Sequence, residues 1–131
     1  MINSGIYDYI NVLDKAADAS YLRNQAIAHN IANDDTPGYK RVDVDFQTVL
    51  KREIGRSKYI SLDEKMKGVN LSHLNVKVQK DLGAFPFSYR IDGNNVDIDT
   101  ENVELAANQI VYQGLNDSMG QEFNRIKQAM S

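Results

Sequence analysis

The sequence contains no cysteine and no tryptophan, and its 131 residues include only two prolines and two histidines. The lack of cysteine excludes disulfides, thiolate metal ligands and cysteine nucleophiles. Aromatic residues make up only 8% of the chain, so the core that a single domain of this length could form is modest. No apolar run approaches the roughly 20 residues that a membrane-spanning helix needs, and we expect no direct membrane insertion.

The chain also lacks an excess of positive charge. Fifteen Lys and Arg stand against 18 Asp and Glu, so nucleic acid is not an expected partner. The N-terminal residues lack a basic region, an apolar block and a small-residue cleavage site, so no cleaved signal peptide is predicted. The middle of the chain is locally basic, at Lys51, Arg52, Arg56 and Lys58. This stretch is either a solvated surface or a contact for an acidic partner.

A long helix is predicted over residues 6–31. Its seam positions alternate in spacing between four and three, as in a coiled coil, and neither Pro nor Gly interrupts them. These positions are Ile6, Ile10, Leu13, Ala17, Ser20, Asn24, Ile27 and Ile31. About 26 residues at 1.5 Å each give a rod of about 40 Å, too long for the core of a small globular domain.

Ser20 and Asn24 place polar side chains in the middle of this seam. They either fix the register of packed helices or mark a rotation of the helix that buries Leu22 and Ala26 instead.

A sharp change of composition ends this helix. Residues 33–36 are Asn, Asp, Asp and Thr, whose short polar side chains compete with helix by bonding nearby backbone. Pro37 cannot donate a hydrogen bond and pushes Thr36 into an extended conformation, and Gly38 accepts a positive φ at little cost. The pattern predicts a fixed helix terminus followed by a turn.

Residues 34–98 are predicted to form a small, partly extended insert. A short helix is expected over 46–54, a loop over 56–74, a half-exposed strand over 75–80, a second extended segment over 85–91 and a turn over 92–95.

A second long helix is predicted to begin near Asp99 or Thr100, with Glu101 and Glu104 placed favourably against the helix dipole. Gly114 and Gly120 each weaken it by about 1 kcal/mol relative to Ala; they either permit close approach of another helix or mark a bend. The seam of this helix contains Leu105, Asn108, Tyr112, Leu115, Met119, Glu122, Ile126 and Ala129.

The predicted fold class is therefore mainly α, with the two terminal helices paired as an antiparallel coiled coil. Residues 1–33 and 99–131 form the discontinuous helical core, and the insert lies between them. Further apolar positions indicate a second face that needs burial, which favours assembly. These positions are Tyr9, Leu22, Val103, Ile110 and Val111.

We predict no catalytic, metal or cofactor site. His29 and His73 are isolated in the sequence. Of the two carboxylate pairs, Asp43/Asp45 and Asp97/Asp99, the second fails to match a calcium loop. No serine-histidine-aspartate order and no phosphate-binding glycine loop is present.

Residues 30–41, NIANDDTPGYKR, resemble the signature near the N-terminus of bacterial flagellar axial proteins. Two further segments resemble the C-terminal region of a short proximal-rod member of the same family: residues 92–99, DGNNVDID, and residues 104–112, ELA-x-NQ-x-x-Y. The chain is thus similar to the flagellar basal-body rod protein family. The resemblance implies that the motif residues set the angle between the inner helix and the insert. They are Asn30, Asn33, Thr36, Pro37, Gly38, Tyr39 and Lys40.

The resemblance also implies a structural subunit of the rod and not an enzyme. Its terminal helices would stack with those of neighbours into a hollow tube that transmits torque and passes exported subunits. The assembly interface would contain Ile6, Ile10, Leu13, Ile27, Ile31, Leu105, Tyr112, Leu115, Met119 and Ile126.

The implied partners are further copies of the chain, neighbouring rod subunits, membrane-ring and rod-adaptor proteins, and the type III export apparatus. The implied location is the basal-body rod in the cell envelope, in the periplasm where an outer membrane is present, after export without a cleaved signal. The residues alone leave a rival open, namely a soluble helical adaptor or secretion chaperone that binds partner helices.

Overall fold

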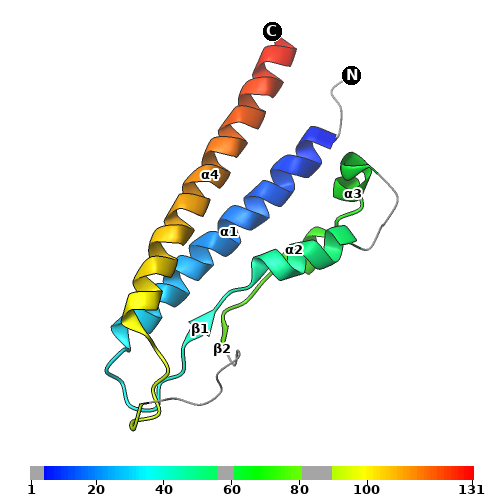
Figure 1. Cartoon of the computed structure of the whole chain (residues 1–131). Coiled ribbons are helices and arrows are strands. Elements are labelled where there is room, and N and C mark those ends of the chain that lie inside the picture. Colours follow the sequence, from blue (N-terminus) through cyan, green and yellow to red (C-terminus); the bar gives the residue numbers. More distant parts are fainter. Residues whose placement is uncertain (1–4, 56–60, 81–89) are drawn as a thin grey trace.

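Two long helices dominate the computed structural model, which describes residues 5–55, 61–80 and 90–131. Helices α1 (Gly5–Ala32) and α4 (Ile98–Met130) lie side by side and run in opposite directions, so the start of α1 and the end of α4 lie at the same end of the pair (Figure 1). The predicted long terminal helices and the mainly helical fold are confirmed.

Shorter elements connect the two helices. They are β1 (Val42–Asp43), α2 (Phe46–Gly55), α3 (Leu62–Lys67), the 3-10 helix η1 (Leu71–Leu74) and β2 (Gln79–Lys80). We call residues 42–55 and 61–80 the arm. The arm lies along α1 on the side away from α4 (Figure 1).

The less exposed face of each long helix follows the predicted seam. In α1, Ile10, Ala17, Ser20 and Ile27 are buried. In α4, the half-buried positions from Leu105 to Ile126 recur at spacings of three and four, whereas Ala129 is exposed. The apolar periodicity therefore predicted one covered face of each helix, whereas a second set of α1 residues is buried off the seam: Val12, Ala19, Ala26 and Asn30.

Polar groups in the seam bond one another between the helices. The Asn108 amide nitrogen donates to the Ser20 carbonyl at 2.8 Å and to Asn24 Oδ1 at 2.7 Å, and the Ser20 hydroxyl donates to Asn108 Oδ1 at 3.1 Å. Ser20 is therefore not rotated out of the helix contact. Ala26 is buried as well, on a helix that also contacts β1, α2 and α3.

The arm packs on α1 through a small apolar cluster centred on Val12, Met66 and Leu74. Tyr9 packs against this cluster, and its hydroxyl donates to Asp63 Oδ1 at 2.9 Å. The expectation that Tyr9 needs burial by another chain is thus met in part within the chain. The cluster also includes partly buried Phe46, Val49, Leu50, Ile54, Val69 and Leu71.

The prediction of a loop over 56–74 was wrong for residues 62–67 and 71–74, which form α3 and η1. Ser61 caps α3 because its hydroxyl oxygen accepts from the Glu64 N–H at 3.3 Å, a spacing typical of helix starts. Asn70 caps η1 in the same manner through the Ser72 N–H. Both helices are short and depend on the burial of Met66 and Leu74. They are too short for a helical periodicity of apolar residues to show in the sequence.

The strand predicted over 75–80 is also shorter than expected. Only Gln79 and Lys80 pair, antiparallel with Asp43 and Val42. The extended segment predicted over 85–91 lies almost entirely outside the described residues, and Ile91 and Asp92 form a turn. The α4 N-cap is Asp97, whose carboxylate accepts from the Asp99 and Thr100 N–H groups, so the predicted start near Asp99 or Thr100 was late.

We expect Leu74→Ala to weaken the attachment of the arm to α1. Leu74 is 1% exposed, and truncating a buried leucine typically costs about 2–5 kcal/mol. Trypsin cleavage after Lys51, Arg52 and Lys67 under native conditions would report the more frequent opening.

Leu62→Ala is the matched control, because Leu62 is 55% exposed and the same truncation should change cleavage little. Equal cleavage rates in the two variants would contradict the assigned packing.

Candidate functional site

Two loops meet at one end of the helix pair, residues 33–41 after α1 and residues 90–97 before α4 (Figure 1). The Gly38 N–H donates to the Asp92 carbonyl at 2.7 Å, and the Asn95 N–H donates to the Tyr39 carbonyl at 3.3 Å. The Lys40 ammonium also donates to a carbonyl of the second loop, that of Gly93. We call these two segments the loop pair.

Asn94 ties the loop pair together. Its side chain is fully buried, and its amide nitrogen lies 2.8 Å, 2.9 Å and 2.8 Å from the carbonyl oxygens of Asn33, Asp34 and Thr36. Its amide oxygen accepts from the Val96 N–H at 2.8 Å. A single side chain therefore satisfies the backbone beyond α1 and shapes the entry into α4.

Asn30 plays the corresponding part at the end of α1. Its amide nitrogen donates to the Val42 carbonyl at 2.8 Å and to Glu101 Oε2 at 3.1 Å. Its amide oxygen accepts from the Val42 N–H at 2.8 Å and from the Tyr39 hydroxyl at 3.1 Å. Burial, with Glu101 nearby, raises the pKa of Tyr39, which favours the protonated hydroxyl that makes this bond. The four bonds use the whole hydrogen-bonding capacity of the amide.

A carboxylate is buried beside Asn30. Glu101 is 1% exposed, and its Oε1 accepts from Arg41 Nε at 2.6 Å. Arg41 also lies 3.6 Å from Asp43. A buried carboxylate is costly unless it is paired and hydrogen-bonded, so Glu101 depends on both Arg41 and Asn30.

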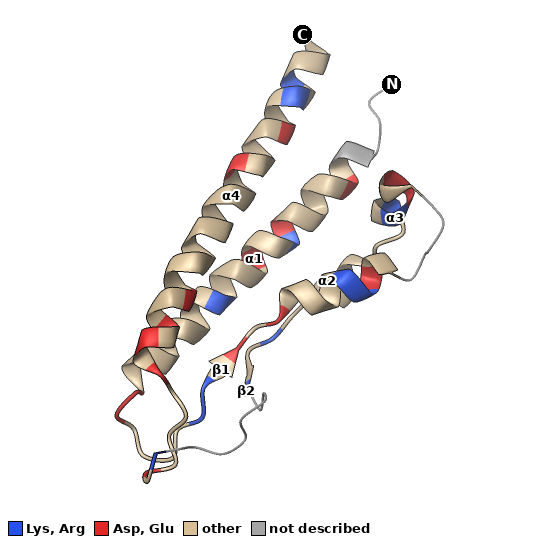
Figure 2. Ribbon diagram, viewed as in Figure 1, with Lys and Arg blue, Asp and Glu red and all other residues tan. Residues whose placement is uncertain are grey.

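Arg23 extends this charged network from the middle of α1. It donates to Asp43 at 2.9 Å and to Glu104 at 2.7 Å, and so joins α1, β1 and α4. Burial alone lowers the pKa of Arg23, but the bonds and charges of Asp43 and Glu104 outweigh burial and hold the pKa above its usual value. Charged residues accordingly gather around β1 and the start of α4 (Figure 2).

Two glycines give the loop pair its backbone path. Gly38 has a φ of 72° and Gly93 a φ of 78°, in the left-handed region that side chains with a Cβ rarely adopt. A Cβ on Gly38 would meet nothing within 4 Å, and one on Gly93 would lie 3.7 Å from Gly38 Cα. The requirement at Gly38 is thus conformational and not a matter of space.

The structure gathers six of the seven predicted motif residues into hydrogen bonds of this region. Thr36 Oγ1 donates to Asn33 Oδ1 at 3.1 Å, and the Asn33 amide nitrogen donates to the His29 carbonyl at 2.8 Å. Pro37 is exposed and acts through its fixed φ. The bonds of Asn30, Gly38, Tyr39 and Lys40 are given above.

Sequence reasoning missed Arg23, Arg41, Asn94 and Glu101 as members of the site. Glu101 was expected only to be placed favourably against the helix dipole; it does lie in the first turn of α4, but its burial was not foreseen. Its position lies four residues before Leu105, on the same seam, so continuing the three-four spacing backward could have found it.

The residues predicted as an assembly interface lie on the covered faces of α1 and α4. Ile10 and Ile27 are buried, and the side chain of Ile6 lies outside the description. The others are half-buried in the single chain: Leu13, Ile31, Leu105, Tyr112, Leu115, Met119 and Ile126. The large apolar side chains that stay exposed on the two helices include Tyr7, Tyr21, Val103, Ile110, Val111, Phe123 and Met130.

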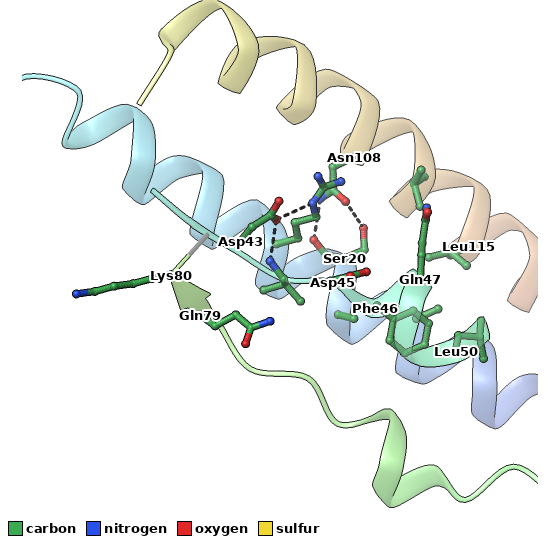
Figure 3. Close-up of a pocket in the computed structure, with 15 residues that line it drawn as sticks. Ser20, Asp43, Asp45, Phe46, Gln47, Leu50, Gln79, Lys80, Asn108 and Leu115 are labelled. Atoms are coloured by element: carbon green, nitrogen blue, oxygen red, sulfur yellow. Dashed lines mark hydrogen bonds and ion pairs between the residues drawn. The ribbon is translucent and has the colours of Figure 1, made fainter. Parts of the chain in front are cut away.

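A cleft of about 740 Å³ lies between the helix pair and the arm (Figure 3). Its polar wall groups bond one another, since Ser20 pairs with Asn108 and Arg23 with Asp43. The remaining wall is largely apolar, from Ala16, Ala19, Phe46, Leu50, Val111 and Leu115. We assign the cleft no chemistry.

Both members of the candidate acidic pair Asp43/Asp45 have structural partners. Asp43 binds Arg23 and Arg41, and Asp45 caps α2 by accepting from the Thr48 N–H at 3.0 Å, a bond that lowers the pKa of Asp45. Within the described ranges, no group of three His, Cys, Asp or Glu side chains is placed to hold a metal ion. In the same ranges, no helix has both the length and the hydrophobicity of a membrane span.

Comparison with known proteins identifies the class. The flagellar basal body rod protein FlgB of Bacillus subtilis (strain 168) is 36% identical over 122 residues, covering 93% of this chain and 92% of that protein. FlgB of Borrelia hermsii is 35% identical over 124 residues, covering 89% and 91%, and FlgB of Salmonella typhimurium is 37% identical over 101 residues, covering 70% of each chain. No family model matches the sequence.

These relatives place the chain among the flagellar basal-body rod proteins. Within that class it belongs to the FlgB family, which confirms the resemblance noted from the two motifs.

We expect Asn94→Asp to open the loop pair. The substitution keeps the shape but removes the donor of three hydrogen bonds, so a carboxylate would face the carbonyl oxygens of residues 33, 34 and 36. Losing the bonds of a buried amide and setting acceptor against acceptor costs about 1–3 kcal/mol or more. Hydrogen exchange of the Gly38, Val42 and Val96 amides should therefore become faster.

Asn102→Asp is the matched control, because Asn102 is exposed on α4. If the three amides exchanged at the same rate in both variants, Asn94 would not hold the loop pair.

Proposed function

We propose that this chain is a structural subunit of the proximal flagellar rod. It polymerises through its terminal helices into a hollow helical tube that transmits torque and lets exported subunits pass. Family membership supports the rod. The observation that supports polymerisation is the low burial of α4. This helix has 33 residues, and its only buried side chains are Glu101 and Asn108.

In this proposal the terminal helices pair as an antiparallel coiled coil. Residues 1–33 and 99–131 form the discontinuous inner core, and residues 34–98 form the outer insert. Half-buried seam residues such as Leu13, Tyr112 and Met119 complete their burial against neighbours. Contacts between different surfaces of successive subunits propagate a helical assembly instead of closing a dimer.

The motif residues then fix the angle between α1 and the insert. The loop pair fixes where α4 begins relative to the end of α1, through Asn30, Asn94 and Gly38. A subunit with a wrong angle would present its helices badly to both neighbours. These residues therefore have a structural role with a mechanical consequence, and the chain is not an enzyme.

The proposed partners are copies of this chain, other rod subunits, membrane-ring and rod-adaptor proteins, and the export apparatus. The subunit reaches the cell envelope by flagellar type III export without a cleaved signal, and lies in the periplasm where an outer membrane exists. Isolated helices are marginal without packing, so the terminal helices gain much of their order on assembly.

Sedimentation and circular dichroism of the purified chain test this proposal. A chain that gains helix as it polymerises supports the rod subunit. A compact monomer or dimer that unfolds cooperatively would instead favour the alternative, a soluble helical adaptor or secretion chaperone. Labelling the chain in isolated basal bodies tests its location directly.

Gly38→Val should reduce swimming in soft agar more than it changes the solubility of the chain. Valine is β-branched and disfavours the φ of 72° found at this position, so the loop pair would be strained by roughly 1–2 kcal/mol or more. We expect Pro37→Ala to impair rod assembly in the same direction, by loosening the backbone before Gly38.

Two variants control for this experiment. Gly38→Asn should swim better than Gly38→Val, because asparagine tolerates the left-handed region. Gly55→Val introduces the same side chain where a Cβ meets nothing within 4 Å and no positive φ is required, and it should swim nearly normally. Normal swimming of Gly38→Val would count against the role assigned to the turn.

A further inference from the structure

Charge is divided unevenly between the arm and the helix pair. The arm carries six Lys and Arg and five Asp and Glu, whereas α1 and α4 together carry four Lys and Arg and eight Asp and Glu. Figure 2 shows basic residues on α2 and α3 and several acidic residues along α1. The overall charge of −3 conceals this separation.

The acidic groups of the arm are mostly engaged. Asp43 binds two arginines, Asp45 caps α2, Glu53 lies 3.3 Å from His73, and Asp63 accepts from Tyr9. The exposed cations of the arm, by contrast, make no ion pair with any acidic residue in the described part of the chain. They are Lys51, Arg52, Lys67, Lys77 and Lys80.

The basic residues of α2 point away from α1. Phe46, Val49, Leu50 and Ile54 pack toward the cluster that contains Val12 of α1. Lys51 and Arg52 occupy the opposite, exposed side of the same helix. They therefore cannot reach α1 of their own chain without undocking α2.

Helix α1 has an uncovered face with the complementary charge. Seven exposed positions recur at alternating spacings of four and three: Tyr7, Asn11, Asp14, Asp18, Tyr21, Gln25 and Ala28. We call them the outer stripe. It is a second seam beside the covered one, with tyrosines that are 48% and 57% exposed.

No cation of the described chain neutralises the middle of the outer stripe. Asp14 and Asp18 are exposed and make no ion pair with a described residue. The nearby cations of α1 are directed elsewhere: Lys15 donates to Asn75 at 2.7 Å, and Arg23 binds Asp43 and Glu104.

We propose that the outer stripe of α1 binds the basic face of α2 from a second copy of this chain. Asp14 and Asp18 meet Lys51 and Arg52, and the exposed tyrosines offer aromatic faces to the same cations. Exposed ion pairs contribute little energy each, so the charges chiefly select the partner face and its orientation. This inference rests on the proposed polymerisation, since it names one contact between successive subunits.

The contact is head-to-tail, because the two faces differ and cannot satisfy each other within one chain. Each subunit would offer its α2 to one neighbour and its outer stripe to the other, so the contact can repeat without closing. In this proposal the basic stretch contacts an acidic partner, which is one of the two alternatives left open by the sequence, and a second copy of the chain supplies that partner.

A crosslinking experiment tests this pairing cleanly, because the chain has no native cysteine. Full-length Asn11→Cys and full-length Thr48→Cys would be mixed at low salt and treated with a short bismaleimide. The mixture should yield a crosslinked dimer, whereas each variant alone should yield far less. Raising the salt to 1 M, where the Debye length is only about 3 Å, should screen the charges and suppress the product.

Charge reversal supplies the decisive comparison. Lys51→Glu with Arg52→Glu in the Thr48→Cys chain should reduce crosslinking roughly tenfold, and so should Asp14→Lys with Asp18→Lys in the Asn11→Cys chain. Combining the two reversed chains should restore it. Lys127→Glu, an exposed reversal on α4, should have little effect, and circular dichroism should show equal helix content throughout.

The outcomes separate this contact from the wider proposal. Crosslinking that ignores both reversals, or reversals that never rescue each other, would overturn the contact while sedimentation still showed a polymer. A chain that never polymerises or crosslinks under any condition would overturn the contact and the rod proposal together.

Discussion

Two buried amides, those of Asn30 and Asn94, hold the geometry on which the rest of the structure depends. Their partners are the backbone groups of Val42 and the carbonyls of residues 33, 34 and 36, all of which lie beyond the end of α1. An apolar side chain of similar size at position 30 or 94 would remove these bonds. The two amides therefore fix the positions of the end of α1, the start of the arm and the start of α4 relative to one another.

Buried polar groups recur along the helix pair for a related reason. Long helices with repeating apolar seams can slide by a turn at little cost, whereas Asn108 finds its partners only opposite Ser20 and Asn24, and Glu101 only opposite Asn30. Such groups add less stability than apolar packing but define register. In the proposed polymer, register matters more than stability, because an error in one subunit would be passed to its neighbours.

The sequence alone predicts the elements that have a long apolar periodicity or a turn rich in Pro and Gly. It predicts far less well the elements that depend on contacts with residues distant in the chain. Both long helices and the Pro37-Gly38 turn follow from local chemistry. Helix α3 and η1 are too short for periodicity and are held by Met66 and Leu74 against α1. The strand expected from residue 75 shrinks to two residues because its partner β1 ends at Asp43, just before Asp45 caps α2. The burial of Glu101 was missed because a favourable place against the helix dipole requires no buried partner.

The distribution of burial along α4 separates the contacts that orient this helix from the contacts that stabilise it. A helix of 33 residues that buries only a carboxylate and an amide is fixed at its start by polar bonds and is only half covered along the rest of its length. Apolar burial is the main source of stability in proteins, and helices gain most of theirs from tertiary packing. In α4, direction and stability therefore have different sources. The loop pair within the chain determines where the helix points, and in the proposed rod the surfaces of neighbouring subunits supply most of the burial that stabilises it.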